Sequence, residues 1–102
     1  MASIEGKDVH KLVVACDAGM GSSVMLASQL RKQLKKYAVT VEHSPVAQIP
    51  ADADVVVCHA GLAERAKATV PEKVVVPFQV FLGDPAVARV VAAVQNGGVV
   101  SG

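Results

Sequence analysis

The sequence contains no tryptophan, one tyrosine and two phenylalanines among its 102 residues. Proteins that read nucleic acids commonly stack bases on aromatic rings, and this composition offers almost none. Charge gives no contrary signal, because ten basic and nine acidic residues leave a formal net charge of +1. We therefore expect that nucleic acid is not a partner of this chain.

Long apolar runs are also missing. No stretch approaches the ~20 residues that a membrane-spanning helix needs, and no signal-peptide pattern opens the chain. These absences predict a cytoplasmic protein without direct membrane insertion. The length fits one domain, whose core would be built mainly from Val and Ala.

Cysteine is scarce, with only Cys16 and Cys58. The two do not form a Cys-x-x-Cys pair, which excludes dithiol redox chemistry, and their spacing matches no zinc template. Two thiols in an intracellular chain are more often free than paired. We expect neither a metal nor any other cofactor.

Apolar runs and helix-period segments alternate along the rest of the chain. Short Val-rich runs predict strands, and apolar residues at helical spacing predict helices. The predicted strands are residues 11–16, 38–42, 55–58 and 74–76. The first predicted helix begins at a cap formed by Ser22 or Ser23. The second covers residues 60–69, and the third runs from Asp84 to Asn96. This order predicts an α/β, Rossmann-like fold with a four-stranded parallel sheet and helices on both faces.

The ends of the chain show no such pattern. Residues 1–10 are polar and lack periodicity, which is typical of a disordered tail or a linker remnant. We expect the folded domain to cover residues 11–98 and a C-terminal tail to cover 99–102.

Cys16 ends the first predicted strand and is followed by a glycine-rich turn that leads directly into a helix. Small residues let successive backbone N–H groups form an anion-binding nest, and the helix N-terminus adds partial positive charge. Both favour the thiolate of Cys16, and the same donors would hold a phosphoryl group attached to its sulfur. We predict Cys16 as the catalytic nucleophile. The predicted phosphate-binding residues are Asp17, Ala18, Gly19, Met20, Gly21, Ser22 and Ser23.

Other anion loops fit less well. No Lys follows the second glycine as in a Walker A loop, and Val24 occupies the third small position of a dinucleotide fingerprint. The loop is closer to that of low-molecular-weight tyrosine phosphatases, which also place a nucleophilic Cys between a strand and a helix. Those proteins carry Arg where this chain has Ser22, and without a guanidinium water attack should be slow. Asp84 before Pro85 is interpreted as a helix cap rather than a catalytic acid. A phosphatase-like hydrolase and a regulatory docking module remain alternatives to a phosphoryl carrier.

Three further residues near the predicted site have different interpretations. Cys58 has no glycine-rich turn after it and is interpreted as a core thiol. His59 is a candidate donor at the rim of the site, although a loop histidine is more often merely exposed. Asp17 would repel a phosphate, so we expect its side chain to point outward, toward a partner protein.

The segment KLVVACDAGMGSS, residues 11–23, resembles the active-site segment of enzyme IIB of the bacterial phosphoenolpyruvate-dependent sugar phosphotransferase system, mannitol type. Weaker similarity continues through residues 52–59 and 61–66, and matching features extend to about residue 96. The resemblance implies a four-stranded parallel sheet flanked by helices. Ala60 departs from the family, which often has Arg or another polar residue directly after the histidine that corresponds to His59.

The resemblance also implies a reaction and its partners. Cys16 would accept a phosphoryl group from a phosphohistidine of enzyme IIA and donate it to a sugar bound by the membrane component, enzyme IIC. A hexitol such as mannitol is the expected sugar. Because enzyme IIB of this type is often fused to enzyme IIC, the cytoplasmic domain would be tethered to the inner membrane through it.

Overall fold

The computed structural model describes residues 3–16, 21–37, 39–79 and 84–101. The strands are β1 (Ser3–Glu5), β2 (Lys11–Cys16), β3 (Thr40–Pro45), β4 (Val55–His59), β5 (Val74–Phe78) and β6 (Val99–Ser101). The α-helices are α1 (Gly21–Leu34), α2 (Ala63–Thr69) and α3 (Pro85–Asn96). Short 3-10 turns are η1 (Gly6–Asp8), η2 (Lys35–Tyr37), η3 (Val46–Gln48) and η4 (Ala60–Leu62).

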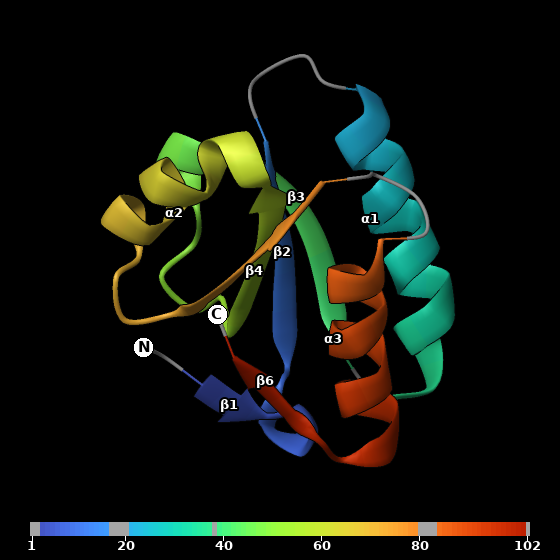
Figure 1. Cartoon of the computed structure of the whole chain (residues 1–102). Helices are drawn as coiled ribbons and strands as arrows, with labels where there is room; N and C mark the ends of the chain where they lie inside the picture. The colour runs from blue at the N-terminus through green and yellow to red at the C-terminus, as the bar shows by residue number, and fades with distance from the viewer. Residues whose placement is uncertain (1–2, 17–20, 38, 80–83, 102) are drawn as a thin grey trace.

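Four strands form one parallel sheet in the order β3-β2-β4-β5. Helices α1 and α3 lie on one side of this sheet, and α2 lies on the other (Figure 1). The α/β fold with a four-stranded parallel sheet and helices on both faces is therefore confirmed. Its order places β2 and β4 at the centre, each with a strand on both sides.

The core consists of two apolar layers that share the central strands. In β2, Leu12 and Val14 belong to the layer under α1 and α3, whereas Val13 and Ala15 belong to the layer under α2. All four side chains are at most 1% exposed. This alternation explains why the strands are continuous runs of small branched residues, since both faces of a parallel sheet are covered.

Two predicted strand boundaries are wrong by a few residues. β3 begins at Thr40 and runs to Pro45, and β5 continues through Pro77 to Phe78. Among the described strands, β4 is the one partner of β5. Proline lacks the N–H that a ladder needs, but an edge strand has one unpaired side and tolerates it.

Helix α3 begins and ends as the sequence predicts. Asp84 is its N-cap, and the Oδ1 atom accepts a hydrogen bond from the Ala86 N–H at 2.7 Å. Pro85 occupies the first turn, and Gly97 ends the helix in the left-handed conformation with φ of 79°. The interpretation of Asp84 as a helix cap is confirmed.

The chain ends differ from the expected tails. β1 and β6 form an antiparallel two-stranded sheet in which Ile4 lies opposite Val100 (Figure 1). Gly6 approaches α3 so closely that an added Cβ would lie 1.9 Å from the Ala93 carbonyl oxygen. Val9 is 2% exposed. Ordered structure therefore extends into both segments interpreted as tails, because apolar side chains from each end are buried against the domain.

The amino-terminal edge of the sheet is held by charge pairs. The Lys11 ammonium lies 3.0 Å from carboxylate oxygens of both Glu42 and Asp52. The Asp54 carboxylate accepts hydrogen bonds from the backbone N–H groups of His10 and Lys11. These contacts tie the start of β2 to β3 and to the segment that precedes β4.

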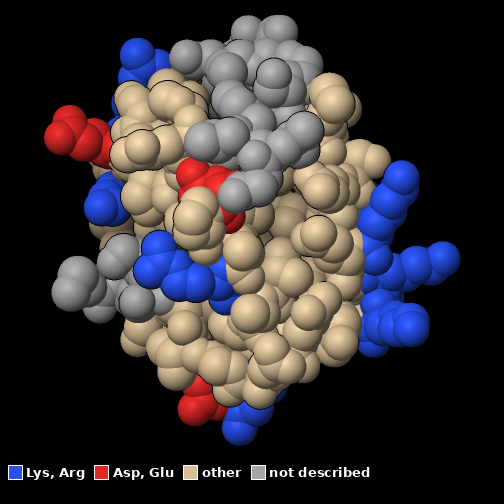
Figure 2. Space-filling view, turned by 45° about the vertical axis from the view of Figure 1, so that its right-hand side comes forward, with Lys and Arg blue, Asp and Glu red and all other residues tan. Residues whose placement is uncertain are grey.

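Basic residues gather where α1 ends. Lys32, Lys35 and Lys36 are exposed there, and the Arg31 Nε atom donates a hydrogen bond to the Val41 carbonyl at 2.8 Å. Figure 2 shows several Lys and Arg side chains projecting together from one edge of the molecule. Cations near a helix C-terminus interact favourably with the helix dipole, which explains why basic residues gather at the end of α1.

Candidate active site

Cys16 is the last residue of β2, at the carboxyl edge of the parallel sheet. It lies opposite Pro45 of β3, and the preceding Ala15 lies opposite Cys58 of β4. From β2 the chain crosses through α1 to β3 on one side, whereas β4 leads through α2 to β5 on the other. The carboxyl ends of β2 and β4 therefore form the topological switch point, where open α/β sheets bind their ligands.

Helix α1 begins at Gly21, five residues after Cys16 in the sequence. The first N–H groups of a helix have no intrahelical partner and carry partial positive charge. The prediction of Ser22 or Ser23 as the cap is wrong, because α1 already begins at Gly21 and both residues lie in its first turn. Ser22 and Ser23 therefore contribute backbone N–H groups from the first turn of α1 to the carboxyl edge of the sheet.

Much of the predicted phosphate-binding segment lies outside the described residues. This applies to Asp17, Ala18, Gly19 and Met20, and to the side chains of Cys16, Ser22 and Ser23. Their predicted roles, the outward direction of Asp17 and the phosphatase-like form of the loop stay predictions. The structure does place the backbone on both sides of the segment, at the end of β2 and the start of α1.

His59 ends β4 and lies beside the switch point. It follows Cys58, which is paired with Ala15, so His59 and Cys16 are the next residues along two neighbouring strands. Its Nδ1 atom accepts a hydrogen bond from the Gly61 N–H at 3.2 Å. The ring contacts Phe78 edge to face, with centroids 6.1 Å apart. Because Nδ1 accepts, the neutral imidazole carries its proton on Nε2.

Cys58 is close in sequence register but differs in environment. Its side chain is fully buried in the layer under α2. Burial raises the pKa of the Cys58 thiol to about 11, and the nearby positive charge of Lys67 offsets only part of that effect. Its interpretation as a core thiol is confirmed.

Two exposed apolar side chains near this edge were not predicted from the sequence. Val24 and Met25, in the first turns of α1, are 52% and 61% exposed. The signal was available in the helical spacing: Leu26 and Leu30 define the buried stripe, and Val24 and Met25 lie off it. They add an apolar surface beside the start of α1.

Two other kinds of feature are absent from the described ranges. None of their helices combines the length and the apolar character that crossing a bilayer requires. The same part of the chain holds no cluster of three or more His, Cys, Asp or Glu side chains that could bind a metal ion.

A strand-end cysteine at the switch point, with a helix start shortly after it, agrees with the similarity of the sequence to known proteins. Residues 11–93 match the family model described as "PTS system, Lactose/Cellobiose specific IIB subunit". The chain belongs to this IIB family of the phosphotransferase system. The match runs from the start of β2 to the last turns of α3 and omits β1 and β6.

Curated relatives narrow the type within the family. The mannitol-specific EIICB component of Bacillus subtilis is 40% identical over 86 residues, 82% of this chain and 18% of the relative. The mannitol-specific cryptic EIICB component of Escherichia coli K12 is 44% identical over 79 residues, 76% of this chain and 17% of the relative. The mannitol-specific EIICBA component of the same organism is 45% identical over 67 residues, 63% of this chain and 10% of the relative.

These similarities confirm the predicted resemblance to a mannitol-type enzyme IIB. The chain spans less than a fifth of the length of these three relatives. The family description names lactose and cellobiose, whereas the relatives are mannitol proteins. Family membership therefore does not by itself name a sugar.

Proposed function

We propose that this chain is a phosphoryl carrier whose working group is the Cys16 thiolate. It accepts a phosphoryl group from a phosphohistidine of enzyme IIA and donates it to a hexitol, such as mannitol, bound by enzyme IIC. The observation that carries the proposal is the position of Cys16 at the switch point, with α1 starting five residues later, in a chain of the IIB family. The names of the relatives, EIICB and EIICBA, support both partners and the hexitol.

The first step transfers the phosphoryl group to sulfur. The thiolate attacks phosphorus as the phosphorus–nitrogen bond breaks, and the histidine nitrogen keeps the electron pair of that bond. Loss of the phosphoryl group leaves this nitrogen able to take up a proton from solvent. Backbone N–H groups at the start of α1 favour the anion before the transfer and the phosphoryl oxygens after it.

The second step passes the phosphoryl group to the sugar. A sugar hydroxyl oxygen attacks phosphorus, the sulfur–phosphorus bond breaks, and the thiolate of Cys16 leaves with the electron pair. The hydroxyl proton is lost to a base on the sugar-binding partner or to solvent. A thiolate stabilised as an anion is also a good leaving group, so the same electrostatics serve both steps.

A carrier has to avoid losing its phosphoryl group to water. Phosphatases of similar loop sequence stabilise the hydrolytic transition state with an Arg, and this chain has Ser22 at that position. Slow hydrolysis is the expected consequence of that absence. A hydrolase would instead require fast turnover of aryl phosphates, and a docking module would require no phosphoryl adduct at all.

The location is a consequence of the same assignment. As a domain working with enzyme IIC, the chain acts on the cytoplasmic side of the inner membrane and is held there through that partner.

Exposed Val24 and Met25, in the first turns of α1, supply apolar surface next to the proposed reaction centre.

Intact-mass analysis after incubation with phosphorylated enzyme IIA tests the proposal. We expect the mass of one phosphoryl group to be added, to disappear in Cys16→Ser, and to remain in the matched variant Cys58→Ala. Addition of enzyme IIC with mannitol should then remove it and yield sugar phosphate. An adduct that survives in Cys16→Ser, or multiple turnover of an aryl phosphate by the isolated chain, would overturn the carrier assignment.

A further inference from the structure

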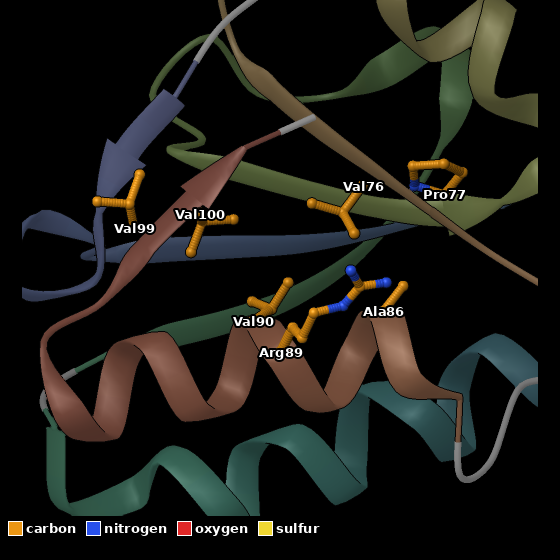
Figure 3. A pocket seen from close by; sticks show the side chains of 7 residues that line it. All are labelled: Val76, Pro77, Ala86, Arg89, Val90, Val99 and Val100. Atoms are coloured by element: carbon orange, nitrogen blue, oxygen red, sulfur yellow. The ribbon is translucent and has the colours of Figure 1, made fainter.

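A cavity of about 220 Å³ lies between the edge strand β5, helix α3 and strand β6. In Figure 3 the side chains that surround it come from these three elements. Its apolar lining consists of Val76, Pro77, Ala86, Val90, Val99 and Val100. None of the described lining residues belongs to the predicted phosphate-binding segment.

Arg89 supplies the charge of this cavity. Its guanidinium extends from α3 toward the space below β5, between Val76 and Ala86 (Figure 3). The Nε atom donates a long hydrogen bond of 3.4 Å to the Pro85 carbonyl. Across the residues that the structure describes, no carboxylate lies within ion-pair distance of Arg89. Arg89, an exposed residue, thus presents a positive charge to a cavity whose other described lining residues are Val, Pro and Ala.

The wall formed by β6 lies outside the region that the family model matches. The family match ends at residue 93, whereas Val99 and Val100 belong to β6. β6 is held by its pairing with β1, which also precedes the matched region. The cavity is therefore completed by a terminal sheet that the family model does not cover. Val99 is 65% exposed, so the wall leaves the cavity open to solvent on one side.

We propose that this cavity binds a small monoanion with a hydrocarbon body, namely a carboxylate with a short, branched alkyl chain. The single guanidinium selects one negative charge, and the valine, proline and alanine side chains favour hydrocarbon over hydroxyl groups. A cavity of about 220 Å³ has room for a carboxylate of about five or six carbons. The proposal is independent of the chemistry proposed at Cys16.

Backbone amide NMR of the full chain, titrated with 4-methylpentanoate, tests this site. We expect saturable shifts at the amides of β5, α3 and β6. The neutral isostere 4-methylpentanamide should bind more weakly by about fivefold, the range expected for one partly exposed charge interaction. Arg89→Gln keeps most of the side-chain stem and should weaken the binding of 4-methylpentanoate by a similar factor.

Two further variants separate this site from nonspecific binding. Ala86→Leu should fill the cavity and abolish the saturable shifts, while the rest of the amide spectrum shows that the fold persists. Lys32→Gln removes an exposed cation at the end of α1 and should leave binding unchanged. Equal binding of acid and amide, shifts unaffected by Ala86→Leu, or shifts confined to the basic end of α1 would each overturn the proposal.

Discussion

The carboxyl ends of the two central strands carry one cysteine each, and the chain around the two residues differs. β2 ends at Cys16 and the chain then leads into a fourteen-residue helix, whereas Cys58 lies inside β4 and is fully buried. The registers place them one residue apart along paired strands. We expect this difference to govern thiol reactivity, because a helix start stabilises a nearby anion and an apolar layer opposes one.

The largest expected effect is in thiol alkylation by iodoacetamide at about pH 7. Because the pKa of Cys58 is raised to about 11, about one molecule in ten thousand carries its thiolate at that pH. We expect Cys16 to react at least about 10³-fold faster in the native protein. Peptide mass analysis measures each rate, and the denatured chain, in which both should react similarly, is the control. Comparable native rates would remove the distinction between the two thiols.

Substitutions of Asp84 test whether this residue contributes to the stability of the fold rather than to the reaction at the carboxyl edge of the sheet. Its carboxylate accepts hydrogen bonds from the Ala86 and Gln79 N–H groups at 2.7 Å, and the residue is 7% exposed. Asp84→Ala should lower the free energy of unfolding by about 2 kcal/mol, because a cap is lost and a second N–H group loses its acceptor. Urea denaturation measures this loss.

The matched variant for that position is Asp84→Asn, which keeps one oxygen as the cap and should cost about 1 kcal/mol. Both variants should still form the Cys16 adduct at temperatures where they are folded. Loss of the adduct in a folded Asp84→Asn protein would show that Asp84 takes part in the chemistry, contrary to its assignment as a cap.

His59 tests how far the reaction centre extends toward β4. Replacing it by Asn retains an acceptor for the Gly61 N–H but removes the imidazole Nε2–H donor. We expect phosphoryl transfer to slow by about fivefold, the effect of one modest hydrogen bond, with little change in melting temperature. Rapid-quench measurement of transfer from enzyme IIA provides the rate. An unchanged rate in a fully folded variant would exclude His59 from the rim of the site.

The smallest expected effect lies at the opposite edge of the sheet. Lys11 lowers the pKa of the Asp52 carboxyl by hydrogen bonding, so this pair stabilises the protein above the unfolded pKa of Asp52 and less as pH falls through its folded value. The pKa of Lys11 is raised by Glu42 first and Asp52 second, so that contribution is lost at strongly alkaline pH.

Lys11→Met should therefore be less stable than the parent near about pH 7 and lose part of that deficit near about pH 3, where the carboxylates are protonated. Because Asp52 is exposed and Lys11 and Glu42 are only partly buried, the difference should be small and should decrease further in high salt. Urea midpoints at the two pH values measure it. A deficit that is unchanged by pH and salt would assign the effect to packing of the side-chain stem instead.

The sequence predicts most of the parallel sheet because each of its strands shows a local signal. Runs such as Val55–Val57 are buried on both faces, and Asp84 with Pro85 marks a helix start that depends only on neighbouring residues. Cys16 stands out for the same reason, since a short segment contains the strand end, the turn and the helix start.

The terminal sheet cannot be predicted from local sequence because it is stabilised by contacts between distant parts of the chain. β1 and β6 are three residues each, too short to show a period, and they pair across nearly the whole sequence. Gly6 packs against Ala93 for a reason that no local pattern contains. Exposed Met25 illustrates a different limit, because a helical stripe identifies which side chains are buried but not which exposed ones contact a partner.

Phosphorus NMR of the chain after reaction with phosphorylated enzyme IIA tests directly whether Cys16 carries the phosphoryl group. We expect one resonance typical of a sulfur–phosphorus bond, present in Cys58→Ala and lost when enzyme IIC and mannitol are added. A resonance typical of phosphohistidine or of a phosphate ester on the folded chain, with none from a sulfur–phosphorus bond, would contradict it.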